Sequence, residues 1–286
     1  MQTFEFQGSA AAITGAASGI GRALALELAA RGSDLALCDL NTEGLESLAR
    51  EIAARHARRV TIRRVDVGDP KQIQDFAAAA IVDFPALNIL INNAGVALLG
   101  QFHEYDQSQF EWLMGINFWG VVHGTRAFLP QLRGRTQAHI VNISSIFGII
   151  APAGQSAYSA AKFAVRGFSE ALRHELAMSD SSVRLSVVHP GGVKTNIARK
   201  ARAGSQLREA PGENEIGDAF EKIARTTPQA AAQRIVRGIE RNERRILIGG
   251  DARLLDIIQR LRPASYWSLL QGVFKRISGG EPSNIV

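Results

Sequence analysis

Short apolar runs alternate with longer amphipathic stretches along most of the chain. The apolar runs have the length of buried strands and cover residues 9–14, 34–40, 60–66, 87–95, 138–144, 183–192 and 244–250. The stretches between them repeat apolar residues at helical spacing and cover residues 22–32, 42–56, 70–83, 108–133, 156–177 and 228–241. This alternation predicts a parallel sheet of about seven strands with helices on both faces. Because such crossovers are right-handed, we predict a single, doubly wound α/β domain.

Local signals support these boundaries. Asp69-Pro70 and Thr227-Pro228 each combine an N-cap residue with a proline at the first helical position. Residues 194–227 are polar and contain several glycines. We interpret them as an excursion over a functional site and not as a linker. We therefore predict one domain over residues 1–250 and a C-terminal tail over residues 251–286.

The tail carries an apolar face, because Trp267, Leu270 and Phe274 recur at spacings typical of one side of a helix. Three interpretations are open: packing over the substrate pocket or the core, an oligomer contact, and a helix on a membrane surface. We favour packing on the domain, because Pro263 breaks the helical pattern and Ser, Gln and Gly dilute it.

The amino-acid composition of the chain argues against several classes of protein. Hydrophobic residues make up 46% of the 286 residues and charged residues 21%, which is typical of a globular protein. The single cysteine, Cys38, excludes an internal disulfide and fits a reducing cytoplasm. The N-terminus does not resemble a signal peptide, and no apolar run approaches the roughly 20 residues that span a bilayer. The net charge is +6, but the basic residues lie scattered beside acids, so we expect no nucleic-acid partner.

A glycine cluster follows the first predicted strand. Gly15, Gly19 and Gly21 lie in TGAASGIG, directly before the first helix. Glycines there let the backbone approach a pyrophosphate, and the helix N-terminus supplies amide donors. An ordinary tight turn would explain the glycines alone, but the strand–loop–helix context indicates a Rossmann-like dinucleotide site.

Asp39 closes the second predicted strand, beside the expected position of an adenosine ribose. A carboxylate there accepts hydrogen bonds from ribose hydroxyls and repels a 2′-phosphate. Ser18 stands where a basic residue would favour that phosphate, although Arg22 is nearby. We therefore favour NAD over NADP as the cofactor.

Tyr158 and Lys162 are four residues apart in a predicted helix, so their side chains share one face. A free phenol has a pKa of about 10, and a neighbouring cation lowers it toward the range that acid–base catalysis requires. Ser145 follows the fifth strand and is placed to hydrogen-bond the same reacting oxygen. Taken alone, the pair would be read as a helix-surface contact.

Several motifs now agree in type and order: TGAASGIG, Asp66, NNAG (residues 92–95), Asn117, Ser145, YSAAK and PGGVKT. Together they resemble the classical short-chain dehydrogenase/reductase family over roughly residues 9–195, and the helix and strand after Pro228 also fit. This sequence has YSAAK where the family more commonly has YSASK, and its C-terminal tail is longer than is usual in the family. Neither difference changes a catalytic residue.

The resemblance implies a role for each catalytic residue. Tyr158 would be the general acid/base, and Lys162 would lower its pKa and hold the nicotinamide ribose. Ser145 would polarise the substrate oxygen, and Asn117 would support a water that links Lys162 to solvent. The residues implied at the cofactor are Gly15, Ser18, Gly19, Ile20, Gly21, Asp39, Asp66, Val67, Asn93, Ala94, Gly95, Tyr158, Lys162, Pro190, Gly191, Val193 and Thr195.

No metal site is expected, because the histidines lack metal-ligand spacing. His189, before Pro190, is interpreted as a packed or capping residue.

The residues expected around the substrate are mostly apolar. Ser145, Phe147, Gln155 and Tyr158 are predicted to contact it, and the expected lining adds Val96, Ala97, Leu98, Leu99, Ile149, Ile150 and Ile197. Without a charged side chain to pair an ionic substrate, this lining predicts a hydrophobic secondary alcohol or ketone. The resemblance also implies a homodimer or homotetramer.

Two other functions compete with this one: a dinucleotide-sensing regulator without turnover, and a reductase of a carrier-bound ketoacyl thioester. The intact set of four catalytic residues argues against the regulator.

Overall fold

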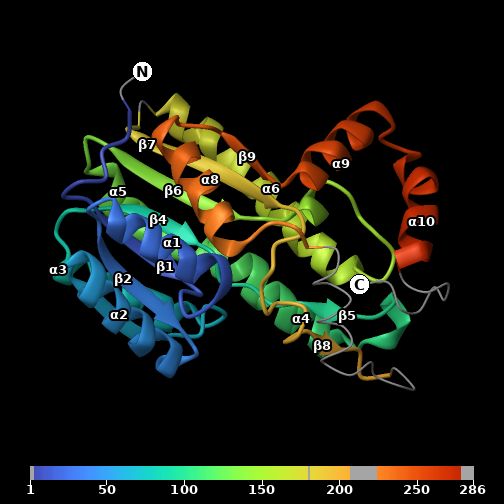
Figure 1. The fold of residues 1–286 in the computed structure, drawn as a ribbon, viewed down its shortest axis with the longest axis horizontal. Helices are drawn as coiled ribbons and strands as arrows, with labels where there is room; N and C mark the ends of the chain where they lie inside the picture. The colour runs from blue at the N-terminus through green and yellow to red at the C-terminus, as the bar shows by residue number, and fades with distance from the viewer. Residues whose placement is uncertain (1–2, 180, 207–223, 278–286) are drawn as a thin grey trace.

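Seven parallel strands form one sheet in the order β3-β2-β1-β4-β6-β7-β9 (Figure 1). The structure is a computed structural model that describes residues 3–179, 181–206 and 224–277. The strands are β1 (Ala10–Thr14), β2 (Asp34–Asp39), β3 (Val60–Arg64), β4 (Leu87–Asn92), β6 (Ala138–Ile143), β7 (Val183–Pro190) and β9 (Arg245–Ile248). All neighbours pair in parallel, so the predicted doubly wound fold is confirmed.

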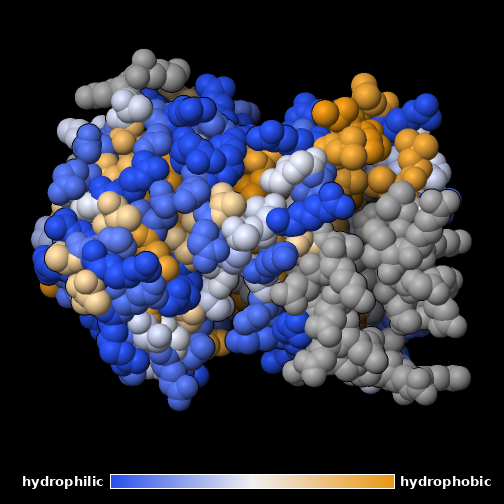
Figure 2. Space-filling model, in the orientation of Figure 1, coloured by the Kyte–Doolittle hydropathy of each residue, from blue (hydrophilic) through white to orange (hydrophobic). Residues whose placement is uncertain are grey.

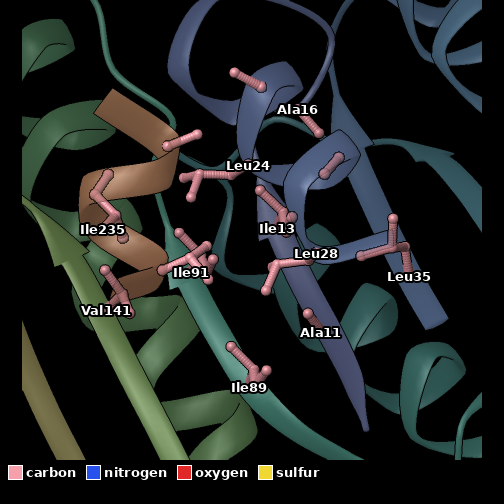
Figure 3. Packing of buried hydrophobic residues seen from close by; sticks show 14 of the residues in the cluster. Ala11, Ile13, Ala16, Leu24, Leu28, Leu35, Ile89, Ile91, Val141 and Ile235 are labelled. Atoms are coloured by element: carbon pink, nitrogen blue, oxygen red, sulfur yellow. The ribbon is translucent and has the colours of Figure 1, made fainter. Parts of the chain in front are cut away.

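Helices cover both faces of the sheet. One face is covered by α1 (Gly19–Ala30), α2 (Thr42–His56) and α8 (Pro228–Glu240), and the other by α3 (Pro70–Asp83), α5 (Gly120–Arg133) and α6 (Ser156–Met178). On the first face, Leu24 of α1 and Ile235 of α8 pack over Ile91 of β4 (Figure 3). On the second, the rings of Phe76 and Phe128 meet edge to face at 5.7 Å. The inner strands β1, β2, β4, β6 and β7 are therefore largely buried on both sides, which explains their nearly continuous apolar sequences. The edge strand β3 instead ends in the exposed Arg63 and Arg64.

The strand order reverses between β1 and β4. From β1 the chain builds β2 and β3 toward one edge, and from β4 it builds β6, β7 and β9 toward the other. In doubly wound proteins, the loops that follow two such strands leave in opposite directions and a crevice forms between them at the carboxyl ends of the strands. Ligands of doubly wound proteins bind at this position.

The region predicted as one helix over residues 108–133 has three parts. These are α4 (Gln107–Met114), a π-helical turn η2 (Gly115–Trp119) and α5. The amide of Gly120 donates to the carbonyl oxygen of Gly115, five residues back, and Asn117 lies buried within this turn. Hydrophobic spacing does not reveal a single wide turn, because the helix continues on either side of it.

The predicted excursion contains a small strand pair. The strands β5 (Leu98–Leu99) and β8 (Arg202–Ala203) pair in parallel. The Arg202 guanidinium lies over the Trp112 ring at 3.8 Å from its centroid, which ties this pair to α4. The part of the predicted excursion over residues 207–223 lies outside the described residues.

Two helices follow β9: α9 (Gly250–Leu261) and α10 (Tyr266–Ile277), with Pro263 between them. Their inner sides pack against the 3-10 turn η3 (Ile146–Gly148) and against Ile149 and Ile150. Leu270 is buried in this contact, and Trp267 is partly buried; the side chain of Phe274 lies outside the described part of the chain. The division of the chain at residue 250 stays a prediction.

Candidate active site

Four loops meet at the carboxyl edge of the sheet. Thr14 ends β1, Asn92 ends β4, Ile143 ends β6 and Pro190 ends β7, and these strands are neighbours in the order β1-β4-β6-β7. The glycine loop, the NNAG segment, Ser145 and the PGG segment follow these four strand ends. The sheet thus brings together motifs that are far apart in the sequence.

The glycine loop packs too closely for side chains. Gly15 has φ of +65°, and a Cβ atom there would lie 2.7 Å from the Cα atom of Ala94. A Cβ atom on Gly21 would overlap the carbonyl oxygen of Gly15. Both positions therefore require glycine, and the backbone of this loop stays accessible to a close ligand.

The N-terminus of α1 retains its anion-binding capacity. Ser18 is the N-cap residue, yet its side chain makes no capping hydrogen bond, and the first turn carries no acidic residue. Amide groups and the helix dipole there favour a negatively charged partner. Together with the glycine packing, this arrangement fits the pyrophosphate of a dinucleotide.

Thr14 joins the glycine loop to the NNAG segment. Its Oγ1 atom accepts hydrogen bonds from the amides of Asn93 at 3.0 Å and Ala94 at 3.1 Å. The Asn93 side chain in turn donates to the carbonyl oxygens of Thr14 and Gly15. Sequence reasoning missed Thr14; a hydroxyl at a buried strand end was its only signal.

Asp39 lies beside the glycine loop, at the end of β2. Its carboxylate accepts hydrogen bonds from the amides of Ala17 and Asn41, both at 3.0 Å. Arg22, the basic residue considered for a 2′-phosphate, pairs instead with Glu51 of α2.

Asp66 and Val67, the predicted adenine neighbours, follow β3. The Asp66 carboxylate accepts the amide of Gly68 at 2.9 Å. Val67 is buried and packs closely against Gly120.

Tyr158 and Lys162 lie one turn apart on α6. The Lys162 Nζ atom is 5.6 Å from the centroid of the Tyr158 ring and donates to the carbonyl oxygen of Ile143 at 3.1 Å. Lys162 is only 3% exposed, whereas Tyr158 is partly buried. The Ser145 side chain lies close enough to the Tyr158 hydroxyl to lower the pKa of the phenol. The three predicted catalytic side chains are therefore in direct or near contact.

Burial sets the protonation states of this group. Desolvation raises the pKa of Tyr158 to about 12, against the opposing hydrogen bond from Ser145. Desolvation also lowers the pKa of Lys162 to about 8. At neutral pH, Tyr158 is therefore a proton donor. The expectation that Lys162 lowers the tyrosine pKa stays a prediction.

Asn117 and Lys162 both face Gly95. A Cβ atom on Gly95 would lie 3.3 Å from the Oδ1 atom of Asn117 and 3.5 Å from Nζ of Lys162. The Asn117 amide exchanges two hydrogen bonds with the backbone of Val96, at 2.8 and 2.9 Å. Asn117 thus holds the loop after β4 beside Lys162, while its predicted link to Lys162 through water stays a prediction.

The segment that follows β7 reaches the glycine loop through Thr195. A Cβ atom on Gly19 would lie 3.1 Å from the Cγ2 atom of Thr195. The Asp251 carboxylate of α9 accepts the amide of Gly192 at 2.6 Å. Sequence reasoning missed Asp251, because nothing in the pattern relates the start of α9 to this segment.

Of the predicted substrate residues, Phe147 contacts the ring of Tyr158. Its ring meets that of Tyr158 edge-on, with centroids 6.1 Å apart. The amide of Phe147 donates to the Ser145 hydroxyl oxygen at 3.1 Å, and Gln155 is buried at the N-cap of α6. The Tyr266 hydroxyl of α10 accepts the amide of Ala151 at 2.9 Å, so the tail also holds this loop.

His189 is fully buried beneath Ser145. Burial lowers its pKa to about 4, so the ring is neutral, and Nδ1 lies 2.9 Å from the carbonyl oxygen of Ser145. The ring N–H therefore donates to that oxygen and helps to fix Ser145. Among the residues that the structure describes, no three His, Cys, Asp or Glu side chains gather to hold a metal ion.

Comparison with known proteins agrees with this geometry. The sequence model of the short chain dehydrogenase family matches residues 9–206. A relative from Mycobacterium tuberculosis that carries the name oxidoreductase SadH is 42% identical over 268 residues, which is 93% of this chain and 95% of the relative. Dehydrogenase/reductase SDR family member 7B of Xenopus tropicalis is 30% identical over 94% of this chain and 87% of its own length.

A similar fold is also present among solved structures. A short chain dehydrogenase/reductase from Burkholderia phymatum, solved in complex with NAD, matches with a TM-score of 0.83 and 30% identity. The match covers 91% of this chain and 95% of that one.

Proposed function

Because the chain belongs to the short-chain dehydrogenase family, we propose that it is an NAD(P)-dependent oxidoreductase that interconverts a hydrophobic secondary alcohol and its ketone. One observation supports this most: Ser145, Tyr158 and Lys162 gather at the sheet edge where the glycine loop begins. A nicotinamide cofactor, when bound, supplies the hydride chemistry. The chain must then orient the substrate and move one proton.

Tyr158 performs the proton step in this proposal. Its protonated phenol donates to the oxygen of a ketone, while the Ser145 hydroxyl donates a second hydrogen bond to the same oxygen. The Lys162 ammonium then stabilises the phenolate that remains, because the two groups share one face of α6. In the reverse direction, the phenolate accepts the proton of an alcohol.

The apolar surroundings of Tyr158 favour a hydrophobic substrate. Phe147 contacts the tyrosine ring edge-on, and Val96 and Leu98 belong to the cluster against which that ring packs. An alicyclic, aryl or steroid-like group suits such a lining better than a sugar phosphate, because a phosphate would lose its hydration against these apolar side chains.

Replacing Tyr158 tests the mechanism. Tyr158→Phe should lower kcat/KM for apolar ketones at least about a hundredfold, because it removes the proton donor. Cofactor binding, measured by NADH fluorescence, should persist. Tyr105→Phe is the matched control, because the Tyr105 hydroxyl bonds to Ser156 and not to the reacting group. Full activity of Tyr158→Phe would refute the mechanism, and a wild-type protein that binds NADH without turning over any alcohol or ketone would indicate a sensor.

We propose NAD as the preferred cofactor. The Asp39 carboxylate lies at the end of β2 against the glycine loop, and Arg22 is occupied by Glu51. A 2′-phosphate would therefore meet a carboxylate and no free guanidinium from Arg22.

The NAD preference is measured as the ratio of kcat/KM for NAD to that for NADP. Asp39→Asn should lower this ratio about tenfold, because the like-charge repulsion is removed. Asp34→Asn is the control: Asp34 lies at the opposite end of β2, where it accepts the amide of Arg59. A higher kcat/KM with NADP in the wild type would contradict the proposal.

The family is generally oligomeric, and we propose a homo-oligomer that assembles through the π-turn, α5 and α6. Trp119 and Phe163, which lie in the π-turn and α6, are 49% and 39% exposed. Burial of such large apolar side chains favours association.

A further inference from the structure

The outer sides of the C-terminal helices are apolar. Leu254, Ile257 and Leu261 of α9 are 58%, 54% and 76% exposed, and Leu269 of α10 is 52% exposed. Figure 2 shows hydrophobic residues gathered at the upper right, where Figure 1 places these two helices. We call these four residues the C-terminal apolar face.

This face is distinct from the packed side of the same helix. Leu254, Ile257 and Leu261 follow the i, i+3, i+7 spacing of one helical stripe. The other side of α9 carries Ala252, which is fully buried, and Leu255, which packs against the residues around η3. One apolar side of α9 is therefore packed inside the folded chain, and the exposed stripe lies on a second side of the same helix.

Positive charge borders the apolar face. Arg253 and Arg262 are exposed on or directly after α9, and Arg260 is exposed while its guanidinium is bonded to Asp256. The two acids of α9 are engaged elsewhere. Asp256 is buried and bonded to Arg245 and Arg260, and Asp251 accepts the amide of Gly192.

We propose that the C-terminal apolar face docks on an anionic lipid surface. Leu254, Ile257 and Leu261 would enter the boundary between headgroups and acyl chains, while the arginines remain at the level of the phosphates. In the described part of the chain, no helix has the length and apolar character to cross a bilayer. The contact is therefore along the membrane surface.

A second copy of the chain suits this face less well than lipid does. In a two-fold contact the same patch of both copies faces itself, so the basic border of one copy would lie close to that of the other. Of the two acids of α9, Asp256 is already paired with Arg245 and Arg260. An anionic lipid surface satisfies both the apolar stripe and its basic border.

Docking would also place the active site near the membrane. The inner sides of α9 and α10 hold the loop that carries Phe147, so one helix diameter of about 10 Å separates that loop from the lipid.

Vesicle sedimentation of the full chain tests the proposal. The protein is incubated with vesicles of phosphatidylcholine alone or of phosphatidylcholine with phosphatidylglycerol. We expect binding to the anionic vesicles, and we expect the double variant Leu254→Glu, Ile257→Glu to lower the partition coefficient about tenfold or more. Val82→Glu is the matched control, because Val82 is 78% exposed on α3, far from this face in the sequence.

A second pair of variants separates charge from apolar burial. The double variant Arg253→Gln, Arg262→Gln should bind anionic vesicles severalfold more weakly than the wild type. The binding that remains should be less sensitive to salt than that of the wild type. Far-UV circular dichroism and turnover of a soluble ketone verify that each variant is folded. Three results would overturn the proposal: no binding to either vesicle, equal binding by the Leu254→Glu, Ile257→Glu variant, or an oligomer that this variant dissociates, which would identify a second copy as the occupant.

Discussion

Two buried histidines show how burial controls charge at single residues. His139 lies near the start of β6 and His189 near the end of β7, and both are fully buried. The Ser186 hydroxyl donates to the carbonyl oxygen of Glu243 at 2.6 Å, so Nε2 of His139 is the donor toward Ser186, at 2.8 Å. Burial lowers the pKa of His139 to about 3, and the ring is neutral at every physiological pH.

This burial makes stability depend on pH. An unfolded histidine has a pKa of about 6.5, so between that pH and about 3 the unfolded chain binds a proton that folded His139 does not. His139 alone should therefore lower the free energy of unfolding by about 1.4 kcal/mol for each pH unit below about 6.

Urea unfolding of His139→Gln between pH 4 and 7 measures this contribution. Glutamine keeps a donor near Ser186 but does not titrate. Below about pH 6, the slope of the free energy of unfolding against pH should therefore be shallower by the equivalent of about one bound proton. An identical slope in His139→Gln and the wild type would exclude His139 as the source.

Among the elements, η3 and α6 carry the candidate catalytic group as a unit. A Cβ atom on Gly148 would lie 2.7 Å from the carbonyl oxygen of Lys162, and the Ser144 hydroxyl donates to that same oxygen at 2.8 Å. The turn after β6 is therefore pressed against the helix that carries Tyr158. This contact keeps Ser145 and the tyrosine at a fixed separation.

The tail fixes the far end of the same loop. Tyr266→Phe removes the acceptor of the Ala151 amide and should loosen the segment that begins at Phe147. We expect KM for bulky apolar ketones to rise severalfold while KM for the cofactor stays constant, and stability to fall by about 1 kcal/mol.

Steady-state kinetics with ketones of increasing size measure the effect of Tyr266→Phe. Ser268→Ala is the control, because it removes a hydrogen bond to Ser265 at the start of α10, away from the loop. If both variants change KM equally, the effect belongs to helix stability and not to the loop.

The principal elements were predictable from sequence, because buried strands and amphipathic helices differ in the spacing of apolar residues. The prolines at Pro70 and Pro228 marked helix starts that the structure has at the same residues. The pair β5 and β8 was not predictable, because each strand has two residues and the pairing depends on distant segments. The π-turn at Asn117 was not predictable either, because the helix continues on both sides of it and the apolar spacing does not reveal a single wide turn.

For the whole molecule, the sheet edge explains why motifs were easier to predict than contacts. The strand order places every carboxyl end at the same edge, so motifs that follow strands meet there whatever their separation in the chain. The bond of Thr14 to the NNAG segment and that of Asp251 to Gly192 depend on side-chain directions. Periodicity carries no information on those directions, so the sequence did not reveal these two residues.

The two parts of the candidate site are held by different regions of the chain. The glycine loop and the NNAG segment are tied to each other through Thr14, at the centre of the sheet. The loop around Phe147 is held instead by α9 and α10, the last helices that the structure describes. Changes in α10 can therefore alter the loop around Phe147 without disturbing the contact between the glycine loop and the NNAG segment, whereas changes in α9 also reach the PGG segment through Asp251. Relatives that keep the same cofactor can in this way diverge in what they oxidise or reduce.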